Sequence, residues 1–124
     1  MAKIQNEMTT DELKKAYKEE LERSIQTQLK QAGIEFKTQV MFSESRKWRF
    51  DIGLTKNNHK HQRVLIDIQG GTWSGGAHVR GKGYENDVDK MNAATALGFE
   101  VYWFTGKQVK DGRAIAFILD YILK

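Results

Sequence analysis

The segment RVLIDIQ, residues 63–69, constrains the fold of this chain more strongly than any other. Four of the five residues from Val64 to Ile68 are apolar, and a short run of this kind is typical of a strand at the centre of a sheet. Asp67 interrupts that run, and Gln69 follows two residues later. Because strand residues two apart share a face, the acid and the amide are expected to point the same way at the end of a buried strand.

A long amphipathic helix is predicted before the first strand. Thr9 and Glu12 are three residues apart, which is the spacing of a capping box at a helix start. Gly33 is the expected stop signal. Between these residues, apolar side chains recur every four positions and draw one stripe along the helix: Leu13, Tyr17, Leu21, Ile25 and Leu29.

Three strands are predicted after this helix. Apolar and polar residues alternate over residues 34–42, which indicates a strand with one buried face. The same alternation over residues 48–54 predicts a second strand, with Phe50 and Ile52 on its apolar face. The third strand is the apolar segment of residues 63–69, reached through a polar hairpin loop.

A helix, a strand and a further helix complete the predicted order. Residues 84–97 show a helical pattern ended by Gly98, residues 99–104 form a strand, and residues 114–123 form a last helix. The order α-β-β-β-α-β-α indicates an α/β fold with a small mixed sheet flanked by helices. At this length a single domain over residues 1–124 is expected.

Composition argues against several classes of protein. Hydrophobic residues make up 40% of the chain, and no apolar run approaches the roughly 18 residues that would suggest a membrane span. The first residues, MAKIQNEMTTDELKK, lack the apolar stretch of a signal peptide. There is no cysteine for a disulfide or a thiolate metal site. A cytoplasmic location is therefore expected.

Positive charge is concentrated in one part of the chain. Residues 31–66 carry seven cations and three acids, so this segment accounts for the whole net charge of +4. A concentrated positive surface favours a polyanion partner, because each neutralised phosphate releases counterions. Solvated surface lysines are the alternative explanation of the same pattern.

Asp51 and Asp67 are the strongest candidates for chemistry. Asp51 lies opposite the apolar face of the second strand, so pairing of the second and third strands can bring the two acids together. Two close carboxylates in an apolar setting repel each other and are costly to bury, which favours a cation between them. Mg²⁺ is the natural candidate, since it is held by carboxylate oxygens and keeps several waters. Salt bridges to Arg49 or Arg63 are the alternative.

A basic, glycine-rich loop follows the central strand. Six of the fourteen residues in 70–83 are glycine, and glycine lets backbone N–H groups approach phosphates without obstruction. A surface loop with its tryptophan folded onto the core is the alternative. The loop also offers cations at every second position and an aromatic face on which bases can stack, so we expect DNA contacts from Trp73, His78, Arg80 and Lys82.

The order and spacing of these features resemble the PD-(D/E)xK nuclease superfamily, and within it small phage and bacterial nucleases similar to the very-short-patch repair endonucleases. The resemblance covers residues 20–110 and rests on the segments ERSI, RKWRFDIGL, VLIDIQGGTW and DVDKMNAATALGFEVYWFTG. The superfamily has an α-β-β-β-α-β core, with an Asp on the second strand and a (D/E)-x-K on the third. This chain departs from that pattern at Gln69, which stands where the superfamily has lysine.

The resemblance implies a restriction-endonuclease-like core and a metal site. Asp51 and Asp67 would bind Mg²⁺, or Mn²⁺, together with the carbonyl of Ile68. Gln69 would position the attacking water. These four residues are adjacent in the predicted sheet, so the implied roles agree with the cation site expected from the two acids.

Three further residues receive roles from the resemblance. Lys90 would replace the missing superfamily lysine and meet the negative charge on the phosphate; an exposed helix lysine paired with Asp87 or Glu85 is the alternative. Glu22 would be an outer metal or water ligand, with ordinary solvent exposure as the alternative. His78 would assist proton transfer to the leaving group.

The expected function is hydrolysis of DNA phosphodiester bonds by a metal-dependent endonuclease. One small domain leaves little chain to read bases, so selection of a DNA structure (junction, flap, mismatch or nick) is expected, as in phage recombination and repair. A homodimer would cut two strands, and a phage-encoded enzyme would act in the host cytoplasm. The alternatives are an inactive DNA-binding protein on this fold, a protein-interaction domain and a sequence-specific nuclease. Phosphate contacts that position the duplex are expected from Arg46, Lys47 and Arg49, in addition to the glycine-rich loop.

Overall fold

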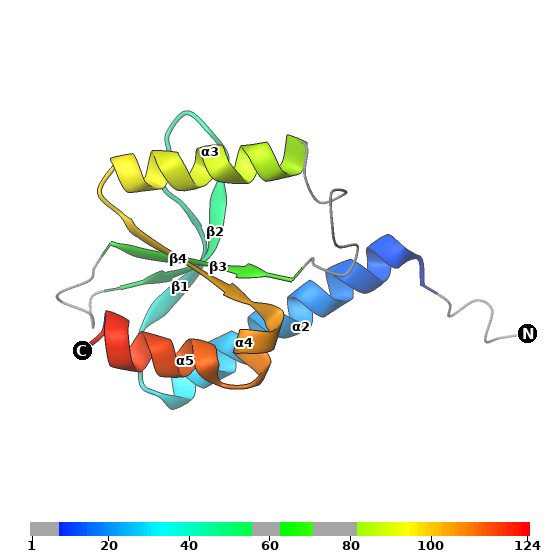
Figure 1. Ribbon diagram of the computed structural model, residues 1–124, viewed down its shortest axis with the longest axis vertical. Coiled ribbons are helices and arrows are strands. Elements are labelled where there is room, and N and C mark those ends of the chain that lie inside the picture. Colours follow the sequence, from blue (N-terminus) through cyan, green and yellow to red (C-terminus); the bar gives the residue numbers. More distant parts are fainter. Residues whose placement is uncertain (1–7, 56–62, 71–81) are drawn as a thin grey trace, which may run out of the picture.

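The computed structural model of this chain describes residues 8–55, 63–70 and 82–124 (Figure 1). The predicted core order α-β-β-β-α-β is confirmed, and a short additional helix, α4, follows the last strand. None of the helices in these described ranges has the length and apolar character of a membrane span. The elements are α2 (Thr10–Gln31), β1 (Phe36–Met41), β2 (Arg49–Leu54), β3 (Val64–Gln69), α3 (Lys82–Ala96), β4 (Glu100–Thr105), α4 (Gly106–Lys110), α5 (Arg113–Phe117) and the π-helical segment η2 (Ile118–Ile122).

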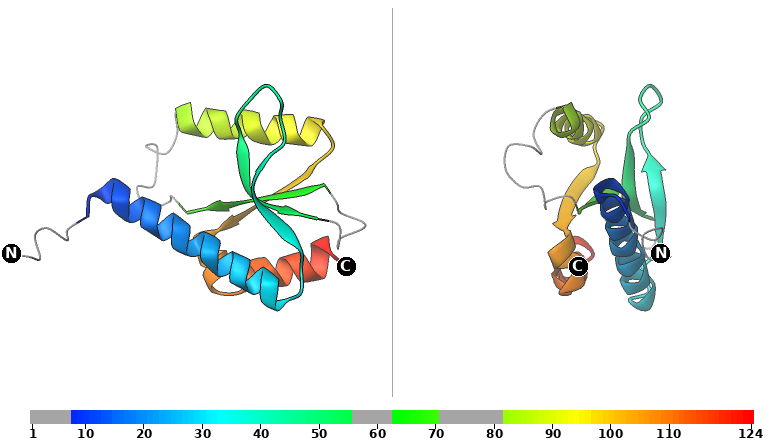
Figure 2. Two further views of the ribbon diagram at one scale, coloured as in Figure 1. Left: turned by 180° about the vertical axis from the view of Figure 1, so that it is seen from behind. Right: turned by 90° about the vertical axis from the view of Figure 1, so that its right-hand side faces the viewer.

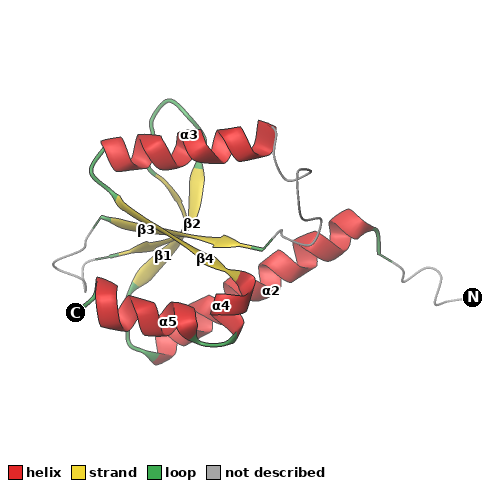
Figure 3. Cartoon of the chain, in the orientation of Figure 1, coloured by secondary structure: helices red, strands yellow, loops and turns green. Residues whose placement is uncertain are grey.

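The four strands form one mixed sheet in the order β1-β2-β3-β4 (Figure 3). β1 pairs antiparallel with β2, and β2 pairs antiparallel with β3. β3 and β4 are parallel, because helix α3 carries the chain across between them. The prediction that β3 lies in the centre of a small mixed sheet is therefore confirmed, and β2 is its central neighbour.

Helices cover both faces of the sheet (Figure 1). Helix α3 lies over one face, and helices α2, α4 and α5 lie over the other. The face under α3 carries a small apolar cluster of Phe50, Leu65 and Ala94. The opposite face carries the larger cluster, which includes Ile52 and Ile66. The central strands β2 and β3 are thus buried on both sides, as the apolar sequence of β3 requires.

Helix α2 begins with the predicted capping box, in which the Thr9 hydroxyl accepts from the Glu12 N–H and the Glu12 carboxylate accepts from the Thr9 N–H. It ends before Gly33, whose φ of +74° is readily adopted by glycine. The apolar stripe is buried from Leu21 onward, but Leu13 is 50% exposed. The reason is visible in Figure 2, where the N-terminal part of α2 extends beyond the sheet.

The predicted alternation of β2 is wrong at one position. Phe50 packs in the cluster under α3, whereas Ile52 packs in the cluster on the other face. On β1, Val40 packs with the cluster under α3 and Phe36 with the cluster on the other face, and Gln39 between them has a left-handed backbone with φ of +51°. Asp51 lies opposite Gln39 but does not form a regular pair with it. The residues of β2 before and after Asp51 therefore place their apolar side chains on opposite faces of the sheet.

The chain after β4 differs from the prediction in one respect. Thr105 and Gln108 form a capping box that starts α4, a helix that the apolar periodicity did not predict. The predicted helix over residues 114–123 corresponds to α5 and η2, which follow one another without a break.

Candidate active site

Asp51 and Asp67 lie side by side where the β2–β3 ladder ends. The last regular pair of the two strands is Ile52 with Ile66, one residue before the two acids. Beyond it, carboxylates take the place of backbone acceptors: the Asp51 N–H donates to Asp67 Oδ1 at 2.9 Å, and the Ile68 N–H donates to Asp51 Oδ2 at 2.8 Å. Each aspartate therefore binds the backbone of the neighbouring strand, which fixes the two carboxylates relative to each other.

Lys90 reaches this pair from helix α3. Its ammonium lies 2.5 Å from Asp67 Oδ2, donates to the Arg49 carbonyl at 2.9 Å and sits 4.5 Å from the centre of the Phe50 ring. Only 8% of Lys90 is exposed. Lys90 is therefore not the exposed helix lysine of the alternative but lies beside the two acids, and its role toward the phosphate stays a prediction.

Lys18 reaches the pair from the opposite face, on helix α2. Its ammonium lies 3.3 Å from Asp51 Oδ1, 3.2 Å from Asp51 Oδ2 and 3.3 Å from Glu22 Oε2. Glu22 also accepts a 3.3 Å hydrogen bond from the Gln39 side chain. Glu22 is thus connected to Asp51 through Lys18, one helical turn away on the same face.

The alternative that arginines form salt bridges with the two acids is wrong for the described part of the chain. Asp51 pairs with Lys18 and Asp67 with Lys90. Arg63 lies at the opposite end of β3, where its guanidinium donates to the Leu97 carbonyl and stacks over the Phe99 ring at 4.3 Å.

The two aspartates open onto a polar cavity of about 400 Å³. It lies at the ends of β2 and β3, between the N-terminal parts of α2 and α3. Acids and cations both line it, so an anionic ligand would meet positive charge beside the carboxylates. Its lining residues are Lys14, Lys18, Arg49, Asp51, Asp67, Ile68, Gln69, Gly70, Asp87 and Lys90.

Burial and charge shift two titrating groups in this site. Burial, and then the neighbouring charge of Asp51, raise the pKa of Asp67 above its ordinary value, although Lys90 acts in the opposite direction. Burial would lower the pKa of Lys18, but Asp51 and Glu22 together raise the pKa above its ordinary value. Lys18 is therefore held as a cation against the acids.

The donor set of the cavity suits a magnesium ion. In the part of the chain that the structure describes, no three His, Cys, Asp or Glu side chains gather into a metal centre. Mg²⁺ does not require such a cage, because it binds through one or two carboxylates and keeps several waters. Asp51 and Asp67 supply two fixed carboxylates, and Ile68 and Gln69 line the same cavity.

The predicted DNA-binding residues are partly described. Arg49 lines the cavity and Lys47 is exposed. The Arg46 guanidinium lies 4.0 Å from the centre of the Trp48 ring, and both side chains donate to Asn86 Oδ1 on α3. Lys82 is the first residue of α3, and the structure describes its backbone alone. The remaining predicted contacts, Trp73, His78 and Arg80, lie outside the described residues.

Sequence reasoning missed two lysines of the cavity, Lys14 and Lys18. The available signal was helical spacing, because Lys18 lies four residues before Glu22 and Lys14 lies four residues before Lys18. All three positions therefore share one face of α2, so the prediction that Glu22 is an outer ligand of the site could have been extended to a role for the two lysines there.

Gly70 explains how α2 comes so close to the end of β3. A Cβ atom at Gly70 would lie 3.1 Å from Leu21 Cδ1 and 3.4 Å from Lys18 Cδ. A larger residue would push the helix, and with it the Lys18 stem, away from the strand. Glycine at this position thus has a packing reason that is independent of the loop that follows.

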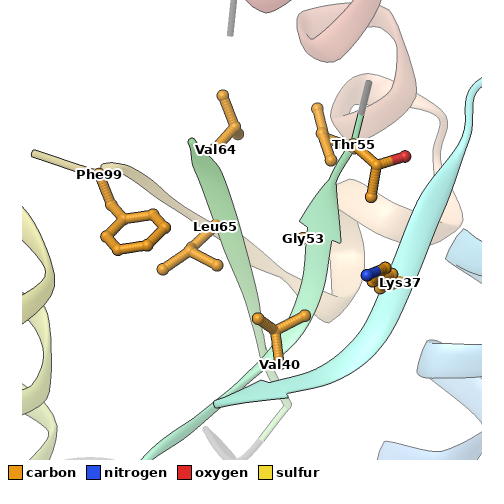
Figure 4. A pocket seen from close by; sticks show the side chains of 8 residues that line it. Lys37, Val40, Gly53, Thr55, Val64, Leu65 and Phe99 are labelled. Carbon is orange, nitrogen blue, oxygen red and sulfur yellow. The ribbon is translucent and has the colours of Figure 1, made fainter. Parts of the chain in front are cut away.

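A second cavity of about 320 Å³ lies at the other end of β2 and β3 (Figure 4). Val40, Leu65 and Phe99 give it an apolar wall, and Lys37 is the charged side chain on its rim. It contains neither aspartate and is separated from the polar cavity along the length of the two strands.

Comparisons with known proteins support the fold. No family model matches this sequence, and no curated protein matches it. Among solved structures, the chain is similar to the catalytic domain of the homing endonuclease I-Bth0305I, with a TM-score of 0.58 and 17% sequence identity. The match covers 80% of this chain and 88% of that domain. This chain therefore shares the fold of an endonuclease catalytic domain.

Proposed function

We propose that this protein is a metal-dependent endonuclease that hydrolyses DNA phosphodiester bonds. The observation that carries the proposal is the pair of buried aspartates from adjacent strands, fixed by reciprocal backbone hydrogen bonds and open to a cavity lined with cations. The likeness to an endonuclease catalytic domain supports the same conclusion. Phosphodiester hydrolysis needs both features, because the metal must be held rigidly and the phosphate must be attracted.

Asp51 and Asp67, with the carbonyl of Ile68, would hold the ion. A bound Mg²⁺ or Mn²⁺ would polarise the scissile phosphate and lower the pKa of a coordinated water. Gln69 is the neutral polar side chain at the strand end and is proposed to orient that water. Lys90 keeps the Asp67 carboxylate in place and provides a buried positive charge to balance the charge that builds on the phosphate.

DNA is the proposed substrate. We expect the protein to select its substrate by the shape of the DNA rather than by the base sequence. Arg46, Lys47 and Arg49 lie on or next to the start of β2 and would hold the sugar–phosphate backbone without reading bases. Junctions, flaps, mismatches and nicks expose phosphates in bent arrangements, which a small domain can recognise by shape. Processing of such structures belongs to recombination and repair, and cutting both strands would require a homodimer.

A cleavage assay tests the proposal. Labelled four-way junction, flap, nicked and linear DNA are incubated with the protein in Mg²⁺ or Mn²⁺ and with a chelator. We expect nicking of the branched substrates that depends on the metal. Asp51→Asn should reduce the rate by about 100-fold or more while keeping DNA binding. Asp120→Asn is the matched control, because Asp120 is an exposed acid on the last helix.

An inactive DNA-binding protein on the same fold is the second candidate. It is favoured by one observation, namely that each aspartate already carries a lysine partner while Gln69 stands at the place of the superfamily lysine. Salt-dependent binding to branched DNA without nicking in either metal would support this candidate. A lack of salt-dependent DNA binding would instead favour a protein-interaction domain.

A further inference from the structure

Lys18 occupies the side of Asp51 that faces the cavity. Asp51 Oδ2 accepts from the Ile68 N–H on the strand side, and both oxygens of Asp51 lie within 3.3 Å of the Lys18 ammonium. A divalent ion that binds Asp51 needs a lone pair of the same carboxylate. The lysine and the ion therefore compete for one carboxylate.

The two lysines of the site differ in how easily they can move. The Lys90 side chain is 10% exposed and is held by Asp67, by the Arg49 carbonyl and by the Phe50 ring. The Lys18 side chain is 34% exposed, and among the described residues its ammonium pairs with Asp51 and Glu22 alone. Lys18 can thus leave Asp51 by rotation of its own side chain, whereas Lys90 cannot leave without disrupting buried contacts.

The surroundings of Lys18 leave it close to the substrate after it leaves Asp51. Its stem passes over Gly70, and its ammonium lies in a cavity that also contains Gln69. Lys14 lines this cavity one turn earlier on the same helix face, which extends the cationic rim. An ammonium released here faces the space in which a bound phosphate would lie.

We infer that Lys18 is a resident counter-cation: it neutralises Asp51 in the metal-free protein, and a divalent ion displaces it onto the phosphate of the bound DNA. The inference rests on the proposed function, because it assumes metal and DNA binding at this site. It gives the site a second cation for the phosphate, on α2, in addition to the buried Lys90. It also makes metal and DNA binding cooperative, since each ligand favours the same position of the lysine.

Metal titration without DNA tests the competition. Mn²⁺ affinity is measured by calorimetry for the wild type and for Lys18→Met. Removal of the competing ammonium should tighten Mn²⁺ binding by about 5-fold, which corresponds to about 1 kcal/mol. Lys18→Arg keeps a cation on Asp51 and should stay within about 2-fold of the wild type. Lys14→Met controls for general charge, because Lys14 lines the cavity without contacting Asp51 or Asp67 in the described structure.

DNA titration tests the displacement. Affinity for a four-way junction is measured with and without Ca²⁺, used here as a divalent ion for a binding measurement rather than for turnover. In the wild type, Ca²⁺ should tighten DNA binding, because it frees Lys18 for the phosphate. In Lys18→Met this enhancement should fall by at least about 3-fold, whereas Lys14→Met should retain it.

The outcomes separate this inference from the proposed function. Equal or weaker Mn²⁺ binding by Lys18→Met overturns the inference, provided that the wild type binds Mn²⁺ and Asp51→Asn does not; the proposed metal site then stands. If neither the wild type nor Lys18→Met binds Mn²⁺, the proposed function fails as well. Circular dichroism of each variant confirms that the comparison is made between folded proteins.

Discussion

The two cavities lie at opposite ends of the same pair of strands, yet they differ in chemistry. At the apolar end, the ladder between β2 and β3 is regular, and Gly53 pairs with Leu65 across it. At the polar end the ladder stops, and carboxylates take over the backbone hydrogen bonds of Asp51 and Ile68. The polar site thus forms at the point where the β2–β3 ladder no longer satisfies the backbone hydrogen bonds of the two strands. Backbone N–H groups at the strand ends hold the two candidate carboxylates in place, so no additional loop is needed to position them.

The largest effect should come from Lys90, at the polar end. Lys90→Met leaves the Asp67 carboxylate buried without its ammonium and should lower the free energy of unfolding by about 3 kcal/mol. Lys37→Met at the apolar end removes an exposed lysine and should change the free energy of unfolding by less than about 0.5 kcal/mol. Urea denaturation measures both values.

A double variant sharpens this result. Asp67→Asn with Lys90→Met removes both charges of the buried pair and should recover part of the loss, since no unpaired charge remains. Equal losses of unfolding free energy for Lys90→Met and Lys37→Met would show that the buried Asp67–Lys90 pair does not stabilise the polar end more than an exposed lysine stabilises the apolar end.

An intermediate effect is expected at the two glycines that allow close packing. At the apolar end, a Cβ on Gly53 would lie 2.9 Å from Val40 Cγ2, so Gly53→Ala should lower the free energy of unfolding by about 1–2 kcal/mol. Cleavage per folded molecule should change little, because Gly53 lines the apolar cavity, whose lining includes neither acid. At the polar end, Gly70→Ala should cost less stability but reduce cleavage, since the nearest atoms belong to Leu21 and Lys18. Urea denaturation measures the stability of both variants, and single-turnover assays measure their cleavage rates. A larger loss of cleavage for Gly53→Ala than for Gly70→Ala would contradict the prediction.

The smallest effect concerns single surface cations. Arg49→Ala at the polar cavity should weaken DNA binding at all sequences and reduce the slope of log affinity against log salt by about 1. Lys37→Ala at the apolar cavity should leave both the affinity and the slope unchanged. Fluorescence anisotropy at several salt concentrations measures them, and equal slopes for the two variants would mean that DNA does not distinguish the cavities.

Much of the fold could be predicted from the sequence because its signals are local. The Thr9 capping box, the stop at Gly33 and the apolar run of β3 each depend on neighbouring residues, and each is found in the structure. The exposed position of Leu13 could not be predicted, since it depends on where the sheet ends relative to α2. The face exchange at Asp51 has no local signal either, because it arises from the backbone of Gln39 on the neighbouring strand.

The two acids and Lys90 could be predicted from the sequence, but Lys14 and Lys18 were missed. Spacing within β3 and pairing with β2 placed Asp51 and Asp67 together, and the resemblance to nucleases suggested Lys90. The pairing of Lys18 with Asp51 joins residues 33 positions apart through helix packing, which periodicity does not report. Salt bridges to Arg49 or Arg63 were the alternative to a metal ion, but the structure pairs the two acids with Lys18 and Lys90.

The exchange of faces in the β1–β2 hairpin has a consequence for how this protein can change. At this exchange Phe50 and Ile52 pack on opposite faces of the sheet, and Asp51 between them reaches Lys18 on α2. Adding or deleting one residue in either strand would shift the register by one and move Asp51 away from its position opposite Gln39. The loop of the hairpin can therefore lengthen without moving the carboxylate, whereas the position of Asp51 opposite Gln39 must be kept.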